Sequence, residues 1–166
     1  MPQVYVAIGS NVDAAMRMQQ VAAAIRARFA DARFSACYRN PAFGFAGEDF
    51  LNAVVGFSTA LPIESLLQQL RQIEMACGRG AADPKWGPRA MDLDLLLYDA
   101  VIGSGAGYTL PRRDLQQRVY MLGPLAELAA NEPLPATGQT IGEVWAAYPQ
   151  AQHVMIRTDI ELNARL

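Results

Sequence analysis

Residues 4–11 read Val4-Tyr5-Val6-Ala7-Ile8-Gly9-Ser10-Asn11. An apolar, β-branched run that ends in Gly-Ser-Asn is typical of a strand followed by a turn. Beyond the turn, apolar residues recur at helical spacing from Met16 to Phe29, and Asp13 is a candidate cap for that helix. These residues predict a strand, a turn and a helix.

The same analysis extends along the chain. Further strands are expected at 32–38, 53–58, 92–98 and 154–156, helices at 62–78, 121–130 and 141–148, loops at 40–49 and 80–88, and a turn at 103–107. The order β-α-β-β-α-β predicts an α+β, ferredoxin-like sandwich: helices packed on one face of a mostly antiparallel sheet, with a mixed C-terminal extension. The sequence contains no repeat or linker, so residues 1–166 are expected to form a single domain.

Composition narrows the possible functions. The chain has 166 residues, 52% of them hydrophobic, and a net charge of −2, which argues against a nucleic-acid binder. No stretch approaches the roughly 20 apolar residues of a membrane span, and the first residues do not resemble a signal peptide, so no membrane partner and a cytoplasmic location are expected. Cys37 and Cys77 lack metal-ligand spacing, and His153 is the only histidine. This argues against a histidine metal site or a Ser-His-Asp hydrolase.

The strongest chemical signal is Trp86-Gly87-Pro88-Arg89-Ala90-Met91-Asp92-Leu93-Asp94. Alternation along a strand puts Asp92 and Asp94 on one face, about 7 Å apart at Cα, and puts Leu93, Leu95 and Leu97 on the other face as core. Adjacent carboxylates repel unless a cation lies between them, and such oxygen ligands suit Mg²⁺, which completes its shell with water and phosphate oxygens. The alternative is that both aspartates simply face solvent.

Two further groups of residues favour a phosphorylated and a flat ligand. Arginine binds phosphate in a bidentate fork, and five arginines lie in or beside predicted loops: Arg79, Arg89, Arg112, Arg113 and Arg118. Phe50 and Asn52 share a strand face and offer a ring and an amide to a heteroaromatic ligand. The alternatives are solvent exposure for the arginines and a core position for Phe50. The sequence has no G-x-x-x-x-G-K-[ST] motif, so ATP would bind without a P-loop.

With these residues in view, the chain resembles the 6-hydroxymethyl-7,8-dihydropterin pyrophosphokinases. The likeness covers residues 4–125 and is most specific from Trp86 to Leu95. Other matching stretches are Ala7–Asn11, Tyr38–Pro41, Phe50–Ala53, Ile73-Glu74, Gly78-Arg79, Pro111, Asp114, Arg118 and Met121–Leu125. The resemblance implies a ferredoxin-like monomer that transfers the β,γ-diphosphate of ATP to the pterin hydroxymethyl group, releasing AMP, in folate biosynthesis.

The resemblance also implies roles for single residues. Asp92 and Asp94 would hold two Mg²⁺ ions, and Arg79 and Arg89 would contact the phosphates, so these four are the expected catalytic residues. Asn52 would bind the pterin edge between the rings of Phe50 and Tyr120, with the backbones of Asn40 and Phe43 nearby and the Gly9–Asn11 turn beside the pocket. The expected ATP-binding residues are Glu74, Arg79, Trp86, Arg89, Arg112 and Arg118.

Two departures from the family pattern leave alternatives open. Pro111-Arg112-Arg113 replaces a stretch that usually contains histidine, and Ala81 and Ala82 stand where the family often has basic residues. Arginine keeps a phosphate donor but cannot exchange a proton near neutral pH. We hypothesise that charge compensation has moved to Arg112 and Arg113. The alternatives are a divergent pterin or nucleotide enzyme and a catalytically silent binding paralogue.

Overall fold

The computed structural model describes residues 1–40, 48–78, 91–149 and 155–163. Its centre is a six-stranded sheet with the order β10-β3-β4-β1-β5, and β2 also pairs with β4. The strands are β1 (Gln3–Ser10), β2 (Arg33–Phe34), β3 (Tyr38–Asn40), β4 (Phe50–Ser58), β5 (Asp92–Tyr98) and β10 (Ile156–Arg157). All of these described pairings are antiparallel. The arrangement is the expected ferredoxin-like α+β fold.

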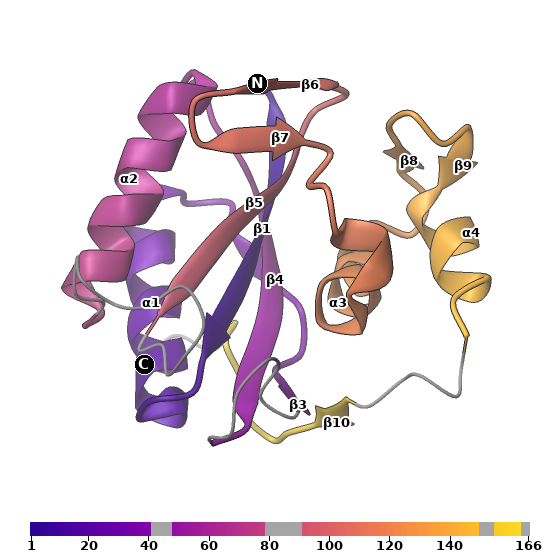
Figure 1. Cartoon of the computed structure of the whole chain (residues 1–166). Helices are drawn as coiled ribbons and strands as arrows, with labels where there is room; N and C mark the ends of the chain where they lie inside the picture. Colours follow the sequence, from indigo (N-terminus) through magenta and orange to yellow (C-terminus); the bar gives the residue numbers. More distant parts are fainter. Residues whose placement is uncertain (41–47, 79–90, 150–154, 164–166) are drawn as a thin grey trace.

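Helices cover both faces of the sheet, not one face as the sequence analysis expected. Helices α1 (Ala14–Arg28) and α2 (Ile63–Ala76) lie on one side, and α3 (Val119–Ala129) lies on the other (Figure 1). Two apolar clusters therefore form, one on each face of the same sheet. Strand β1 is flanked by β4 and β5, and its residues Val4–Ser10 are buried because both faces of the sheet are covered.

The predicted second strand, 32–38, is divided in two by Ser35. The Ser35 N–H donates to the Val54 carbonyl at 2.8 Å, and the Ser35 hydroxyl accepts from the Val54 N–H at 2.9 Å. A side-chain oxygen thus takes the place of a backbone carbonyl in the ladder. This exchange interrupts regular pairing between β2 and β3.

A β-bulge in β5 corrects the expectation that Leu97 would share a face with Leu93 and Leu95. Tyr5 is paired with Leu97 and Val6 with Leu95, so Leu96 is an extra residue in β5. An extra residue reverses the alternation beyond it. Leu93 and Leu95 therefore pack with α1 and α2, whereas Leu96 and Leu97 pack with α3.

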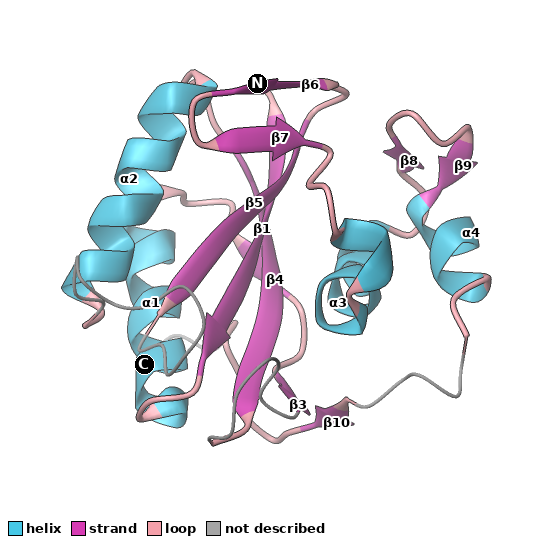
Figure 2. Ribbon diagram, viewed as in Figure 1, coloured by secondary structure: helices cyan, strands magenta, loops and turns pink. Residues whose placement is uncertain are grey.

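Two hairpins and a short helix complete the fold (Figure 2). The expected turn at 103–107 is part of a hairpin of β6 (Gly103–Gly105) and β7 (Tyr108–Leu110). A second hairpin joins β8 (Pro133–Leu134) and β9 (Gln139–Thr140), and it leads into α4 (Ile141–Ala146) through a Thr140–Glu143 capping box. Asp13 occupies the N-cap position of α1, but its side chain makes no capping hydrogen bond.

Within the described ranges, no helix is long and apolar enough to cross a membrane.

Candidate active site

The register of the neighbouring strands β4, β1 and β5 lines up polar residues on the face covered by α3. Gly9 in β1 is paired with Asn52 in β4 and with Asp92 in β5, while Ala7 is paired with Asp94. Directly paired residues point to the same face of a sheet. Asp92 and Asp94 therefore share a face, as the sequence predicted, and Asn52 lies on that face across Gly9.

Gly9 lets the Asn52 side chain lie close to the backbone of β1. A Cβ placed on Gly9 would lie 3.0 Å from Asn52 Oδ1 and 3.8 Å from Phe50 Cδ1. A side chain here would crowd the Asn52 amide. The absence of a side chain at Gly9 thus leaves the Asn52 amide in place beside Phe50.

The Asn52 amide is held by a second amide. Its Nδ2 donates to Asn40 Oδ1, and both residues are buried. The Gly9–Asn11 turn is held as well, since Asn11 Nδ2 donates to the Glu48 carbonyl at 3.1 Å. The Asn40 side chain thus orients Asn52, a function that the sequence analysis, which assigned only its backbone, did not foresee.

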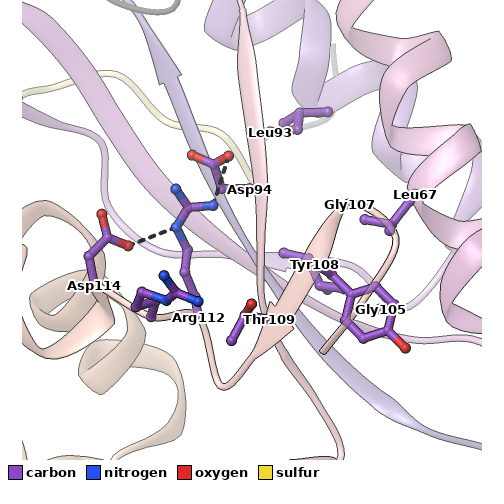
Figure 3. A pocket seen from close by; sticks show the side chains of 11 residues that line it. Leu67, Leu93, Asp94, Gly105, Gly107, Tyr108, Thr109, Arg112 and Asp114 are labelled. Carbon is purple, nitrogen blue, oxygen red and sulfur yellow. Dashed lines mark hydrogen bonds and ion pairs between the residues drawn. The ribbon is translucent and has the colours of Figure 1, made fainter. Parts of the chain in front are cut away.

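On the other side of Gly9, Asp94 is part of a cluster of consecutive ion pairs with Arg112, Asp114 and Arg118. Arg112 Nη1 lies 3.1 Å from Asp94 Oδ1, and Arg112 Nε lies 2.9 Å from Asp114 Oδ1 (Figure 3). Arg118 Nε is 3.5 Å from the other Asp114 oxygen. The sequence placed Arg112 and Arg118 at ATP phosphates, and the structure adds that acidic side chains hold both.

Burial of Asp94 raises its pKa to about 7, and the neighbouring carboxylate of Asp92 adds to the rise, while Arg112 opposes it. The shift reflects two carboxylates on one face of a strand with limited access to water. A bound cation would remove this conflict, so the electrostatics of the pair suit a metal ion. Among the described residues no group of three or more His, Cys, Asp or Glu side chains could hold a metal. Two carboxylates are nevertheless enough when a phosphate completes the shell of Mg²⁺.

A cavity of about 560 Å³ adjoins Asp94 on the side away from Asn52. It lies between α2, β5 and the β6–β7 hairpin (Figure 3). Its lining is Leu67, Leu93, Asp94, Leu95, Gly105, Gly107, Tyr108, Thr109, Arg112, Arg113 and Asp114. One end is apolar and the other carries the charges of Asp94, Arg112 and Asp114. The sequence analysis missed the hairpin, although Tyr108-Thr109-Leu110 after a glycine-rich stretch is a strand signal.

Glu74 lies under the strand instead of in this cavity. The side chain is buried, and its Oε2 accepts from the N–H of Leu93, between the two aspartates, at 2.8 Å. A buried carboxylate that bonds to the backbone fixes the strand. Glu74 thus positions β5, and its role at ATP stays a prediction.

The remaining predicted residues divide into two groups. Tyr120, at the start of α3, is partly buried; burial raises the pKa of its hydroxyl, with smaller effects from Arg118, Asp114 and Asp94. Its ring therefore lies in the field of the charged cluster. Phe43, Arg79, Trp86 and Arg89 lie outside the described residues.

The chain is similar in sequence to proteins of known family. A family model described as 7,8-dihydro-6-hydroxymethylpterin-pyrophosphokinase matches residues 5–130. The chain is similar to 2-amino-4-hydroxy-6-hydroxymethyldihydropteridine pyrophosphokinases of Methylorubrum extorquens, with 38% identity over 88% of this chain and 93% of that protein. For the Pseudomonas aeruginosa protein of the same name, identity is 37% over 89% and 92%.

A solved structure is similar in fold. A crystal structure of Plasmodium falciparum HPPK-DHPS superposes with a TM-score of 0.70 at 11% identity. The match covers 94% of this chain and 45% of the Plasmodium chain, so this chain spans less than half of that protein.

Proposed function

The chain belongs to the 7,8-dihydro-6-hydroxymethylpterin-pyrophosphokinase family and is a pyrophosphokinase of folate biosynthesis; from this premise we propose how its residues carry out the transfer. The reaction moves the β,γ-diphosphate of ATP to the hydroxymethyl group of 6-hydroxymethyl-7,8-dihydropterin and releases AMP. One observation carries the proposal: Asn52 and Asp92 are both paired with Gly9, on the same face of the sheet. The pterin and the diphosphate can therefore meet above Gly9.

The pterin lies on the Asn52 side of Gly9. The Asn52 amide, oriented by Asn40, both donates and accepts hydrogen bonds, as the edge of a pterin requires. Phe50 and Tyr120 enclose the ring from β4 and α3. Support comes from Gly9, where a Cβ would lie 3.0 Å from Asn52 Oδ1 and displace the amide.

ATP lies on the Asp94 side. The apolar end of the cavity, at Leu67 and Tyr108, suits the base, and the charged end at Arg112 and Arg113 suits the phosphates. The volume of about 560 Å³ is in the usual range for a small-molecule site. This orientation directs the terminal phosphates toward Asp94 and the pterin.

Asp92 and Asp94 hold Mg²⁺ in this proposal. When bound, the metal offsets the charge of the diphosphate and makes the pterin hydroxyl more acidic. The residues of the chain position the reactants. Glu74 fixes β5 at Leu93, between the two aspartates, and Asn52 fixes the pterin, which accepts the diphosphate. For Arg79, Arg89, Trp86 and Phe43 the support is the sequence motif alone, which places the two arginines at the phosphates, Trp86 at ATP and Phe43 at the pterin.

We further propose that residues 1–166 act as one domain and as a cytoplasmic monomer. Two apolar clusters that share one sheet support a single domain. Free, buried Cys37 and Cys77 are compatible with a reducing compartment. Light scattering of the purified protein tests the monomer, and a mass of two chains would contradict it.

The test of the function is AMP release from ATP and Mg²⁺, with and without 6-hydroxymethyl-7,8-dihydropterin. The wild type should form AMP only with the pterin, and Asp94→Ala should lose at least about a hundredfold of this rate. Asp99→Asn is the matched control, because Asp99 follows the same strand, away from the cavity, with a φ of 48° that asparagine also tolerates. Pterin-dependent AMP that persists in Asp94→Ala would contradict the proposed site.

A further inference from the structure

We propose that Arg112 is a tethered cation that holds the Asp94 carboxylate until a divalent metal displaces it, and then turns to the phosphates of ATP while Asp114 keeps hold of it. The inference rests on the proposed function, because it needs Asp94 to be a metal ligand. It assigns Arg112 two alternating partners and makes Asp114 the positioning residue for both states.

The geometry provides a pivot. Arg112 uses different nitrogens for its two ion pairs: Nη1 for Asp94, at 3.1 Å, and Nε for Asp114, at 2.9 Å. The contact with Asp94 can therefore break while the contact with Asp114 remains. The backbone is fixed too, since the Arg112 N–H donates to the Leu96 carbonyl at 3.0 Å. Only the end of the side chain has to move.

The charges favour displacement of Arg112 from Asp94 by a divalent ion. Asp94 Oδ1 is the oxygen that Arg112 Nη1 contacts, and its side chain is only 25% exposed. A divalent ion on that oxygen would lie close to the guanidinium, and two cations at such a distance in a half-buried site repel strongly. Metal and Arg112 therefore compete for Asp94.

The cavity offers the displaced guanidinium its next partner. Asp94, Arg112 and Asp114 all line the space that the proposal gives to ATP. Phosphate oxygens there can accept the hydrogen bond of Arg112 Nη1 that Asp94 gave up. Nucleotide thus favours the displaced state, and metal and nucleotide assist each other's binding by linkage.

The test is a Mn²⁺ titration, followed by electron paramagnetic resonance, of the full chain with no nucleotide. Arg112→Gln should bind Mn²⁺ about tenfold or more tightly than the wild type, because the competing cation is gone. Arg113→Gln is the matched control, because it removes an equal charge from the same cavity lining. The ion pairs that the described residues make with Asp94 and Asp114 involve Arg112 and Arg118. The control should change the affinity less than about threefold.

A second titration adds the non-hydrolysable α,β-methylene analogue of ATP. The difference in Mn²⁺ affinity between wild type and Arg112→Gln should then shrink, and Arg112→Gln should bind the analogue about tenfold more weakly. Equal effects of Arg112→Gln and Arg113→Gln on Mn²⁺, or no effect of either, would overturn the tethered cation. Asp94→Asn tests the proposed metal site separately from the role of Arg112. If it binds Mn²⁺ with the analogue as tightly as the wild type, the metal site fails and the tethered cation fails with it.

Discussion

At the scale of single residues, the candidate site requires a residue without a side chain at position 9. Asn52 and Asp92 are both paired with Gly9, on neighbouring strands about 5 Å away on either side. The absent side chain lets the Asn52 amide lie against the backbone of β1, on the face that also carries Asp92. Gly9 is needed here for space, since its backbone lies in a regular strand.

The first residue-scale prediction is that Gly9→Ala impairs pterin binding and leaves ATP binding intact. The new Cβ would lie 3.0 Å from Asn52 Oδ1 and force the amide aside. We expect the KM for the pterin to rise about tenfold and the KM for ATP to change less than twofold, as for a loss of one or two hydrogen bonds. Steady-state kinetics measure both, and thermal unfolding confirms that the variant folds. An unchanged pterin KM would contradict the position of the pterin above Gly9.

The second residue-scale prediction concerns thiol reactivity and pH. Burial raises the pKa of the Cys37 thiol to about 11, and burial also raises that of Cys77. The thiolate is the reactive form, and a raised pKa lowers its population at neutral pH. The reaction rate of Cys37 should therefore be low and should rise with pH up to about 11. At pH 8 Cys37 should react with Ellman's reagent at least about a hundredfold more slowly in the native protein than in concentrated urea, and Cys77 should also react more slowly in the native protein. Rapid native reaction at pH 8 would show that these thiols are accessible.

At the scale of elements, a bulge and a hairpin shape the cavity beside Asp94. The extra residue Leu96 reverses the alternation in β5, so that Asp92 and Asp94 face the site while Leu97 joins the core under α3. The β6–β7 hairpin then closes the cavity with Tyr108 and Thr109. Gly105 lets the Tyr108 ring pass over it, because a Cβ there would lie 2.5 Å from that ring.

The element-scale prediction is that the hairpin binds ATP and not the pterin. Tyr108→Ala should raise the KM for ATP about five- to tenfold through loss of an aromatic contact, with the pterin KM unchanged. Ile102→Ala is the control, since Ile102 precedes the same hairpin and is 64% exposed outside the cavity. Steady-state kinetics with each substrate varied in turn decide the matter. Equal changes in both KM values, or a change in the control, would point to a structural effect.

At the scale of the whole molecule, the last described residues pack against the N-terminal third of the chain. Strand β10 pairs with β3, and Leu162 is buried in the cluster under α1. Asn163 then bonds to both the N–H and the carbonyl of Phe34, each at 2.9 Å. Residues after 154 therefore complete the core on the α1 side, beside the strand that carries Asn40.

The whole-molecule prediction is that this return stabilises the fold. Leu162→Ala should lower the free energy of unfolding by about 2–4 kcal/mol, the usual cost of a buried leucine. Ile156→Ala is the control, since Ile156 is 64% exposed, and it should cost less than about 1 kcal/mol. Urea unfolding followed by circular dichroism measures both. Equal, small losses would mean that the returning segment adds little stability.

The sequence by itself determined most local elements and indicated the family. Apolar spacing predicted β1, α1, α2 and β5 because period and turn residues act within a few residues. Alternation in Asp92-Leu93-Asp94 placed both carboxylates on one face for the same reason. Motif spacing was enough to indicate the family, which the comparisons confirmed.

Only the tertiary structure decided features that depend on partners distant in sequence. The division of β2 from β3 requires Ser35 to meet Val54, and the bulge at Leu96 requires β1 as partner. Arg112 is paired with Asp94 because a hairpin returns the chain to β5. Such contacts depend on the register between strands, and the residues on one strand do not specify which residues face them from the next.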